Sequence, residues 1–237
     1  RDTFCDWWVE LSKPLLAADD PAVADETRRT GAWVLARTLH LLHPLAPFVT
    51  EELWDKLFGA PGGMLIVAEW PELSQALVDP AAERDLAWLI AAVSAIRSAR
   101  SELNVPPAAQ LHLLVLDASA ETLARLQRHD EALRRLARLA DVAVGAGAPP
   151  TGAIQVVHEE AILALPVAGV IDLAQERQRL AKELERARNE TARIAAKLDN
   201  PSFVERAPPD VVAEQRERLA EWRNTGTRLA QALGRIA

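Results

Sequence analysis

The chain has 237 residues, of which 49% are hydrophobic and 26% charged, with 27 Lys and Arg against 34 Asp and Glu. This composition is too apolar for a disordered chain, and a net charge of −7 argues against a protein that coats nucleic acid by bulk charge. The single cysteine, Cys5, excludes an internal disulfide and a four-cysteine zinc site, and it favours a cytoplasmic protein.

The ends of the chain and its apolar runs bear on its size and location. The sequence begins at Arg1 and its one methionine is the internal Met64, so we expect a piece of a longer protein. The longest unbroken apolar run, 86–93, is far shorter than the ~20 residues of a membrane-spanning helix. No membrane partner is therefore expected.

Charge is unevenly distributed along the chain. Residues 1–171 contain 14 Lys and Arg against 23 Asp and Glu, whereas residues 172–237 contain 13 against 11. A polyanionic partner is therefore expected at the tail rather than at the body.

The first hundred residues predict a helical region. Apolar residues recur at helical spacing in four segments, predicted as helices at 4–15, 26–42, 50–58 and 81–103. Between them we expect an acidic loop at 18–25, a helix start capped by Thr50, and a short extended piece at 64–68. Cys5 and the tryptophans at positions 7, 8, 33, 54 and 88 are expected in the core.

The pattern changes after a Pro-rich stop near residue 106. We predict a strand at 111–116, an amphipathic helix at 121–139, a strand at 141–144 and a hairpin of 154–157 with 161–167. These elements indicate a small α/β module.

Two heptad series run through the tail. Mostly apolar or small residues alternate in steps of four and three from Leu173 to Leu198, and in steps of three and four from Val212 to Ile236. A Pro-bearing break at 200–209 separates the two series, which predicts an antiparallel helical hairpin with arms of roughly 40 Å. The fold class expected for the whole chain is mainly α, with a helical bundle, a small α/β module and a C-terminal coiled-coil hairpin.

The sequence contains no catalytic constellation, because it has neither a Gly-rich phosphate loop nor a nucleophile elbow. His40 and His43 have a spacing that a metal can use on a helix, but no cysteine or carboxylate clusters beside them. Packing at a helix end is favoured, and no catalytic or metal-binding residue is assigned. The pairs Glu51–Glu52 and Glu159–Glu160 indicate capping and turn residues.

The basic residues of the tail are sorted by face. Four of them share one outward face of the first tail helix: Arg179, Lys182, Arg186 and Arg193. Glutamates at seven-residue intervals form a line beside them, so the pattern fits a solvated coiled-coil surface with ion pairs as well as a nucleic-acid-binding face. Near the turn, Arg193 can lie close to Arg216 or Arg218, where two guanidinium planes can stack on exposed bases.

Two further arginines, Arg97 and Arg100, lie near the end of the fourth predicted helix. Their pattern fits two interpretations, pairing with nearby acids such as Glu102 or contact with RNA.

Five segments, in this order, resemble the C-terminal region of bacterial valyl-tRNA synthetases, which are class I enzymes. They are 4–14 (FCDWWVELSKP), 42–54 (LHPLAPFVTEELW), 96–107 (IRSARSELNVPP), 169–173 (GVIDL) and 200–204 (NPSFV), the last with Ala207 and Pro208. The first segment resembles a helix of the anticodon-binding domain, and the last resembles the turn of the terminal coiled coil. The resemblance extends over essentially the whole chain.

The resemblance implies a division into three parts: 1–108, a partial anticodon-binding helical domain; 109–170, a linking α/β module; and 171–237, a tRNA-binding coiled-coil arm. It implies tRNA(Val) as partner, with the eight basic residues named above as candidate RNA ligands, and a cytoplasmic monomer without DNA or membrane partners. The parent enzyme would use ATP and Mg²⁺ in catalytic and editing domains upstream. Their HIGH and KMSKS signatures do not occur here, so the chain alone is expected to have no cofactor and no catalytic activity.

An alternative of a different class is a protein–protein or dimerisation module without RNA affinity. It stays open because helical hairpins with apolar seams often self-associate.

Overall fold

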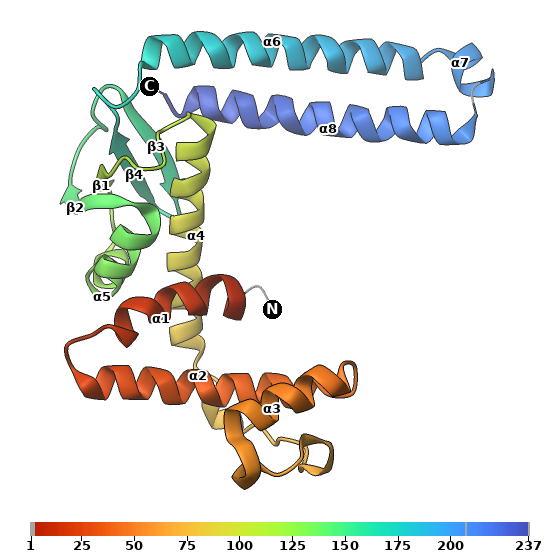
Figure 1. Ribbon diagram of the computed structural model, residues 1–237. Helices are drawn as coiled ribbons and strands as arrows, with labels where there is room; N and C mark the ends of the chain where they lie inside the picture. The colour runs from red at the N-terminus through yellow and green to blue at the C-terminus, as the bar shows by residue number, and fades with distance from the viewer. Residues whose placement is uncertain (1–2, 207, 237) are drawn as a thin grey trace. The chain divides into compact units, whose positions relative to one another are not determined.

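The computed structural model describes residues 3–206 and 208–236 (Figure 1). The chain divides into two compact units, residues 1–84 and 85–237. Helices predominate and four strands form one sheet, which confirms the predicted mainly α class with a small α/β module and a helical hairpin. The three-part division at 108/109 and 170/171 stays a prediction. No helix in the described part of the chain is long and apolar enough to cross a membrane.

The first unit is helical. Its elements are η1 (Thr3–Trp8), α1 (Val9–Leu16), α2 (Pro21–Leu42), α3 (Pro47–Gly62), η2 (Leu65–Val67) and η3 (Gln75–Leu77). The predicted loop at 18–25 is wrong in extent, because α2 begins at Pro21. There the carboxylate of Asp20 accepts a hydrogen bond from the N–H of Ala22 at 2.9 Å, and proline is well suited to the first helical turn.

Two local predictions in this unit are wrong. Thr50 is not an N-cap, because α3 begins at Pro47 and the Thr50 hydroxyl donates to the carbonyl of Ala46 at 2.9 Å. Residues 65–67 form a 3-10 turn instead of an extended piece. The carboxylate of Glu51 accepts hydrogen bonds from the N–H groups of Leu65 (2.7 Å) and Ile66 (3.1 Å), a contact that local propensity does not reveal.

The core of the first unit includes Leu39, Trp54 and Leu65. Trp54 donates its indole N–H to the carbonyls of Gly62 (3.2 Å) and Gly63 (3.1 Å), which satisfies its polar atom inside the core. The expectation of core positions holds for Trp54, and also for Trp88 in the second unit, but Trp33 is 41% exposed. Trp7 and Trp8 are half-buried, and Trp8 packs so closely on α2 that a Cβ at Gly31 would lie 2.4 Å from its ring. Cys5 is exposed, so its predicted core position is wrong; the side chain of Phe4 lies outside the described residues.

The second unit combines α4 with the sheet. Its elements up to the tail are most of α4 (Pro80–Glu102), β1 (Leu111–Leu116), α5 (Ala120–Ala137), β2 (Leu139–Gly145), β3 (Ala153–His158) and β4 (Ala161–Pro166). The strand order is β2-β1-β4-β3, with β1 and β2 parallel and the other two pairs antiparallel. A parallel pair needs a crossover, which α5 provides. Leu89, Val93 and Ile96 of α4 are fully buried.

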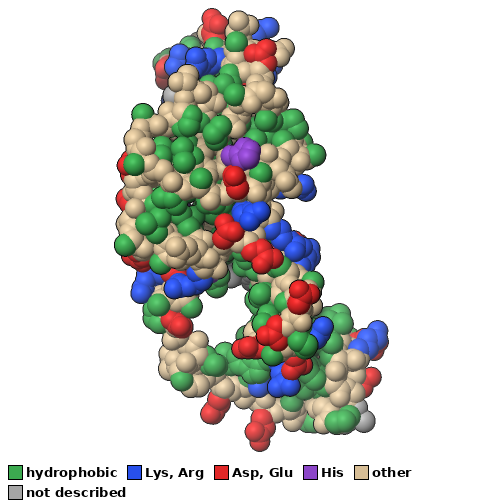
Figure 2. Space-filling view, turned by 90° about the vertical axis from the view of Figure 1, so that its left-hand side faces the viewer, with side chains coloured by type: hydrophobic (Ala, Val, Ile, Leu, Met, Phe, Trp, Pro, Cys, Tyr) green, Lys and Arg blue, Asp and Glu red, His purple; other side chains and the backbone are tan. Residues whose placement is uncertain are grey.

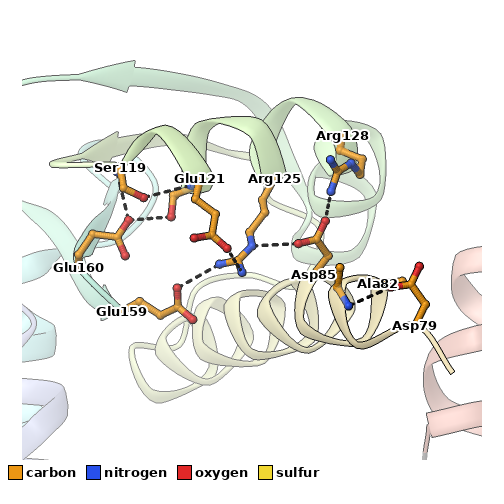
Figure 3. A network of polar contacts seen from close by, with 11 residues as sticks. Asp79, Ala82, Asp85, Ser119, Glu121, Arg125, Arg128, Glu159 and Glu160 are labelled. Carbon is orange, nitrogen blue, oxygen red and sulfur yellow. Dashed lines mark hydrogen bonds and ion pairs between the residues drawn. The ribbon is translucent and has the colours of Figure 1, made fainter.

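A buried arginine connects α5 to α4 and to the hairpin turn of the sheet (Figure 3). The side chain of Arg125 is only 8% exposed, and it forms ion pairs with Asp85 (3.2 Å), Glu121 (2.6 Å) and Glu159 (3.3 Å). Its guanidinium carbon also lies 6.0 Å from the ring centroid of Trp88. Because the partners neutralise its charge, Arg125 can be buried without the cost of an unpaired ion.

The tail forms an antiparallel helical hairpin, as predicted. Its elements are α6 (Leu173–Leu198), α7 (Pro201–Arg206) and α8 (Pro209–Gly234). The buried positions of α6 and α8 include the predicted seam residues Leu180, Ala187, Ile194, Val212 and Gln215. The seam residue Arg177 is exposed instead, and the short helix α7 stands where only a Pro-bearing turn was predicted. Ala207 of that segment lies outside the described residues.

The root of the hairpin is fastened to the end of α4 by polar contacts. The Arg179 guanidinium binds the carboxylates of Glu176 and Glu183 and donates to the carbonyl of Glu102 at 3.0 Å. Arg235 forms an ion pair with Glu102. The hydrogen bonds that the Arg179 guanidinium donates to the carboxylate of Glu176 are the main cause that raises the pKa of Arg179 above its usual value.

The carboxylate of Glu160 offers a test of the sheet–helix contact. It accepts hydrogen bonds from the Ser119 N–H (3.1 Å) and the Thr122 hydroxyl (2.7 Å), and bonding to Ser119 and Thr122 lowers its pKa from 4.5 to about 2. The carboxylate therefore stabilises the fold above pH 4.5, and this contribution is lost as the pH falls towards 2. We expect Glu160→Gln to lower the melting temperature at pH 7 by about 2 °C and to flatten its decline between pH 4.5 and 2.

The matched control is Glu131→Gln, because Glu131 lies on the same helix α5 and is exposed. Thermal unfolding followed by circular dichroism across this pH range provides the measurement. Identical pH profiles for the two variants would contradict the assignment.

Arg179 gives a second test, at the root of the hairpin. Arg179→Gln removes the bonds to Glu176, Glu183 and the Glu102 carbonyl, so the first turns of α6 should lose protection from amide hydrogen exchange. We expect the melting temperature to fall by about 2–4 °C. Arg186→Gln is the control, because Arg186 lies two turns further on and is exposed. If both variants exchange at the same rate, Arg179 does not fasten the root.

Candidate nucleic-acid interface

The basic residues predicted on one face of α6 differ in their exposure and in the groups to which they bind. Arg179 is half-buried and its donors are directed to the carboxylates and the carbonyl at the hairpin root. Lys182 and Arg186 are exposed, and neither forms an ion pair with a described residue. Arg193 is exposed and pairs with Glu190 at 2.6 Å, a surface contact that a phosphate can replace at low cost.

The flank of the hairpin that carries Arg193 follows from helix geometry. At the root, Arg179 and Glu183 of α6 line one pocket with Thr225 and Arg228 of α8, which shows that these flanks face the same side. Arg193 follows Arg179 by fourteen residues and Arg218 precedes Thr225 by seven, so at about 100° per residue both stay near that side. Arg216 precedes Thr225 by nine residues and lies on the opposite side. Helix periodicity therefore places Arg193 and Arg218 on the same flank of the hairpin and Arg216 on the other; their approach to each other stays a prediction.

The tip of the hairpin contains a cation–π contact that the sequence did not predict. The ammonium group of Lys197 lies 4.5 Å from the ring centroid of Phe203 in α7. A cation over an aromatic face fixes the end of α6 against α7. In the sequence, Lys197 and Phe203 lie on the two sides of the start of the break at residue 200, which could have indicated the contact. Their approach, however, depends on α7, which was not predicted.

Arg100 lies in a different environment from the arm residues. It is 6% exposed, and its guanidinium donates to the backbone carbonyls of Ala137 (3.3 Å), Arg138 (3.0 Å), Pro106 (3.4 Å) and Ala109 (2.6 Å). Burial, followed by the charge of Arg138, lowers its pKa. Arg100 therefore connects α4 both to the turn that follows this helix and to the end of α5. Pairing of Arg100 with Glu102, one of the two interpretations of the sequence, is not found, because Arg100 binds carbonyls and Glu102 pairs with Arg235.

Arg97 is exposed one turn before Arg100, and its Nε donates to the carbonyl of Leu136 at 2.8 Å. Together with Arg100 and Arg138 it lines a pocket of about 510 Å³. Arg138 was not among the predicted ligands, because its place next to the two α4 arginines depends on how α5 folds back.

Charges of both signs are mixed on the face shown in Figure 2, where basic and acidic side chains are interspersed among hydrophobic ones and the described residues form no large field of one sign. Since the net charge of the chain is −7, a nucleic-acid contact on this face would depend on local groups of arginines rather than on the overall potential.

The two candidate histidines have neighbours within the first unit. His40 Nδ1 lies 2.8 Å from the carbonyl of Ala36, and its ring stands edge-on to Trp54 with centroids 4.8 Å apart. His43 Nδ1 lies 2.8 Å from the hydroxyl of Thr50. In the described part of the chain, no group of three or more His, Cys, Asp or Glu side chains is arranged to hold a metal ion.

Two family models match the chain. Residues 1–115 match the anticodon-binding domain of tRNA ligase, and residues 172–237 match the valyl tRNA synthetase tRNA binding arm. The second match begins at Asp172, the residue that caps α6 by accepting from the N–H groups of Ala174 and Gln175, both at 3.0 Å. The matched arm is therefore the helical hairpin.

Similar proteins cover the chain almost completely. The valine–tRNA ligase of Caulobacter vibrioides is 48% identical over 100% of this chain, and that of Granulibacter bethesdensis is 46% identical over 99%. The enzyme of Mesorhizobium japonicum is 45% identical over 98%. The chain spans about a quarter of the length of these curated relatives, 26%, 26% and 25% respectively. The two matched domains and the identity along the whole chain point to the same family. The chain belongs to the valyl-tRNA synthetase family and corresponds to the C-terminal part of its members.

Proposed function

We propose that the chain is the tRNA-binding C-terminal portion of a valine–tRNA ligase, with tRNA(Val) as its partner. The observation that carries this proposal is the order of the two matched regions, an anticodon-binding domain followed by a tRNA-binding arm. The exposed guanidinium groups of Arg193 and Arg218 on one flank of the hairpin support it, because arginine suits phosphate and stacked bases.

In this proposal the parts of the chain have different tasks. The helical region at 1–108 supports recognition of the anticodon arm, the α/β module links it to the hairpin, and the hairpin grips the outer corner of the tRNA. Valine activation with ATP and Mg²⁺ belongs to the remaining three quarters of the parent enzyme. The chain alone is monomeric and has no catalytic activity.

The first test measures the binding of tRNA(Val) to the whole chain by filter binding at several salt concentrations. Arg193→Ala combined with Arg218→Ala removes two cations from the same flank near the tip. We expect the affinity to fall at least about tenfold. The slope of log affinity against log salt should become shallower by about 1.8, because each lost phosphate contact accounts for about 0.9.

The matched control is Arg188→Ala combined with Arg216→Ala, which removes the same charge from other faces of the same arm. Arg188 lies five residues before Arg193, so it points about 140° away around α6. This control should retain most of the affinity. Equal losses in both double variants would contradict the assignment of the flank, and equal binding by wild type and the Arg193 and Arg218 variant would contradict a role for the tip.

A dimerisation module predicts a different outcome in solution. Light scattering over a range of concentrations should show a monomer if the proposal holds. A concentration-dependent dimer formed through residues 172–237, together with no measurable affinity for tRNA, would favour the protein–protein alternative.

Catalytic activity provides a separate prediction. The chain should not support valine-dependent exchange of pyrophosphate into ATP, because we place activation in the remainder of the parent enzyme. The measurement is isotope exchange with the purified chain, and a full-length valine–tRNA ligase is the positive control. Exchange above background would overturn this assignment.

A further inference from the structure

A basic pocket lies where α4 and α5 both end, beside the root of the hairpin, and it shares Ser101 and Asn104 with the pocket that Arg179 lines there. Its volume is about 510 Å³. It is lined by the last turns of the two helices and by the turn that follows α4. Its polar lining includes Arg97, Arg100, Ser101 and Arg138.

The pocket has an excess of positive charge. Three guanidinium groups line it, and among the described lining residues none is Asp or Glu. The carbonyls at the end of α5 accept hydrogen bonds from Arg97 and Arg100, but a helix C-terminus carries only about half a negative charge. Burial and the neighbouring Arg138 lower the pKa of Arg100, as expected for a cation without a neutralising anion.

Arg125 in the same unit shows how this chain neutralises a buried arginine with acids of its own. That side chain meets three carboxylates, Asp85, Glu121 and Glu159. The guanidinium of Arg100 meets only backbone carbonyls. Unlike Arg125, Arg100 has no carboxylate among its hydrogen-bond partners, so an anion in the pocket would meet a guanidinium group whose charge is offset only by carbonyl dipoles.

The backbone of Arg138 is a second observation at this place. It follows α5 in the left-handed conformation, with φ 53° and ψ 59°, where helices commonly have glycine. A residue with a Cβ pays a conformational cost in this region, and such cost is often found where the side chain is used. Arg138 is exposed, so its guanidinium is accessible to a ligand.

We propose that this pocket binds a phosphate group, with Arg97 and Arg138 as its ligands and Arg100 as the buried cation that holds the surrounding backbone in place. A phosphate oxygen pair fits the planar fork of a guanidinium group, and Ser101 adds a hydroxyl donor at the rim. The phosphate belongs either to the backbone of an RNA strand or to a small phosphate compound. Naming RNA as a source rests on the proposed function, whereas the phosphate site itself does not.

The test uses the whole chain and inorganic phosphate titrated to millimolar concentrations at constant ionic strength. Binding is followed through the Nε–H resonances of the arginines in NMR spectra and through the melting temperature. We expect saturable shifts at Arg97 and Arg138 in the wild type. Arg138→Asn removes the guanidinium but tolerates the left-handed backbone, and it should weaken phosphate binding at least tenfold.

Arg135→Asn is the matched control, because Arg135 is exposed on the same helix and does not line the pocket. It should bind phosphate like the wild type. Phosphate stabilises folded proteins in general, and this effect is the same for the wild type and the two variants. Only the difference in melting temperature between them therefore reports binding at the pocket. No saturable shift in the wild type, or the same loss in both variants, would overturn the proposal.

A second arm of the experiment identifies the source of the phosphate. If RNA supplies it, Arg138→Asn should make the salt dependence of tRNA binding shallower by about 0.9, and inorganic phosphate should compete with tRNA. If a small phosphate compound supplies it, tRNA binding stays unchanged while phosphate binding is lost. Failure of the proposed function is recognised separately, because the wild type would then bind phosphate but not tRNA.

Discussion

The buried face of α4 is the constraint on which the second unit depends. Leu89, Val93 and Ile96 are fully buried along it, so the helix must lie within the unit rather than on its surface. Its side chains reach β3 through Trp88, whose ring is 5.3 Å from that of His158, and its last turn reaches the end of α5 through Arg97 and Arg100. The hairpin is then fastened to the carboxyl end of the same helix, so the position of the arm within the unit follows from the burial of α4.

The arginines of this chain fall into two groups, those that hold the fold together and those that can meet an anion from outside. Their exposure and their binding partners distinguish the two groups. Arg125 and Arg100 are buried and hold segments together, the first through carboxylates and the second through carbonyls. Arg193 and Arg218 are exposed, and a new anion can reach them without first separating a buried network. Since the hydrogen-bonding capacity of a guanidinium group is finite, an arginine that already serves the fold contributes little to binding RNA.

The acidic net charge is compatible with a role in binding tRNA. A chain of charge −7 gains little from long-range attraction to RNA, so the proposed function assigns recognition to a few guanidinium groups placed at fixed positions. The heptad seam provides such positions on the hairpin, because it fixes which flank of α6 faces which flank of α8. The ends of α4 and α5 bring a separate group of guanidinium side chains together in the basic pocket.

The sequence by itself determined the features that repeat locally. Heptad spacing predicted the hairpin and most of its seam, short apolar runs predicted the four strands, and family motifs indicated tRNA as the partner. Tertiary structure decided what local pattern cannot contain. The 3-10 turn at Leu65 depends on Glu51, and which flank of α8 lies on the same side as Arg179 depends on how the two helices of the hairpin face each other. The burial of Arg100 depends on carbonyls up to 38 residues away. These features depend on residues that are distant in sequence, and neither periodicity nor local propensity predicts which distant residues meet.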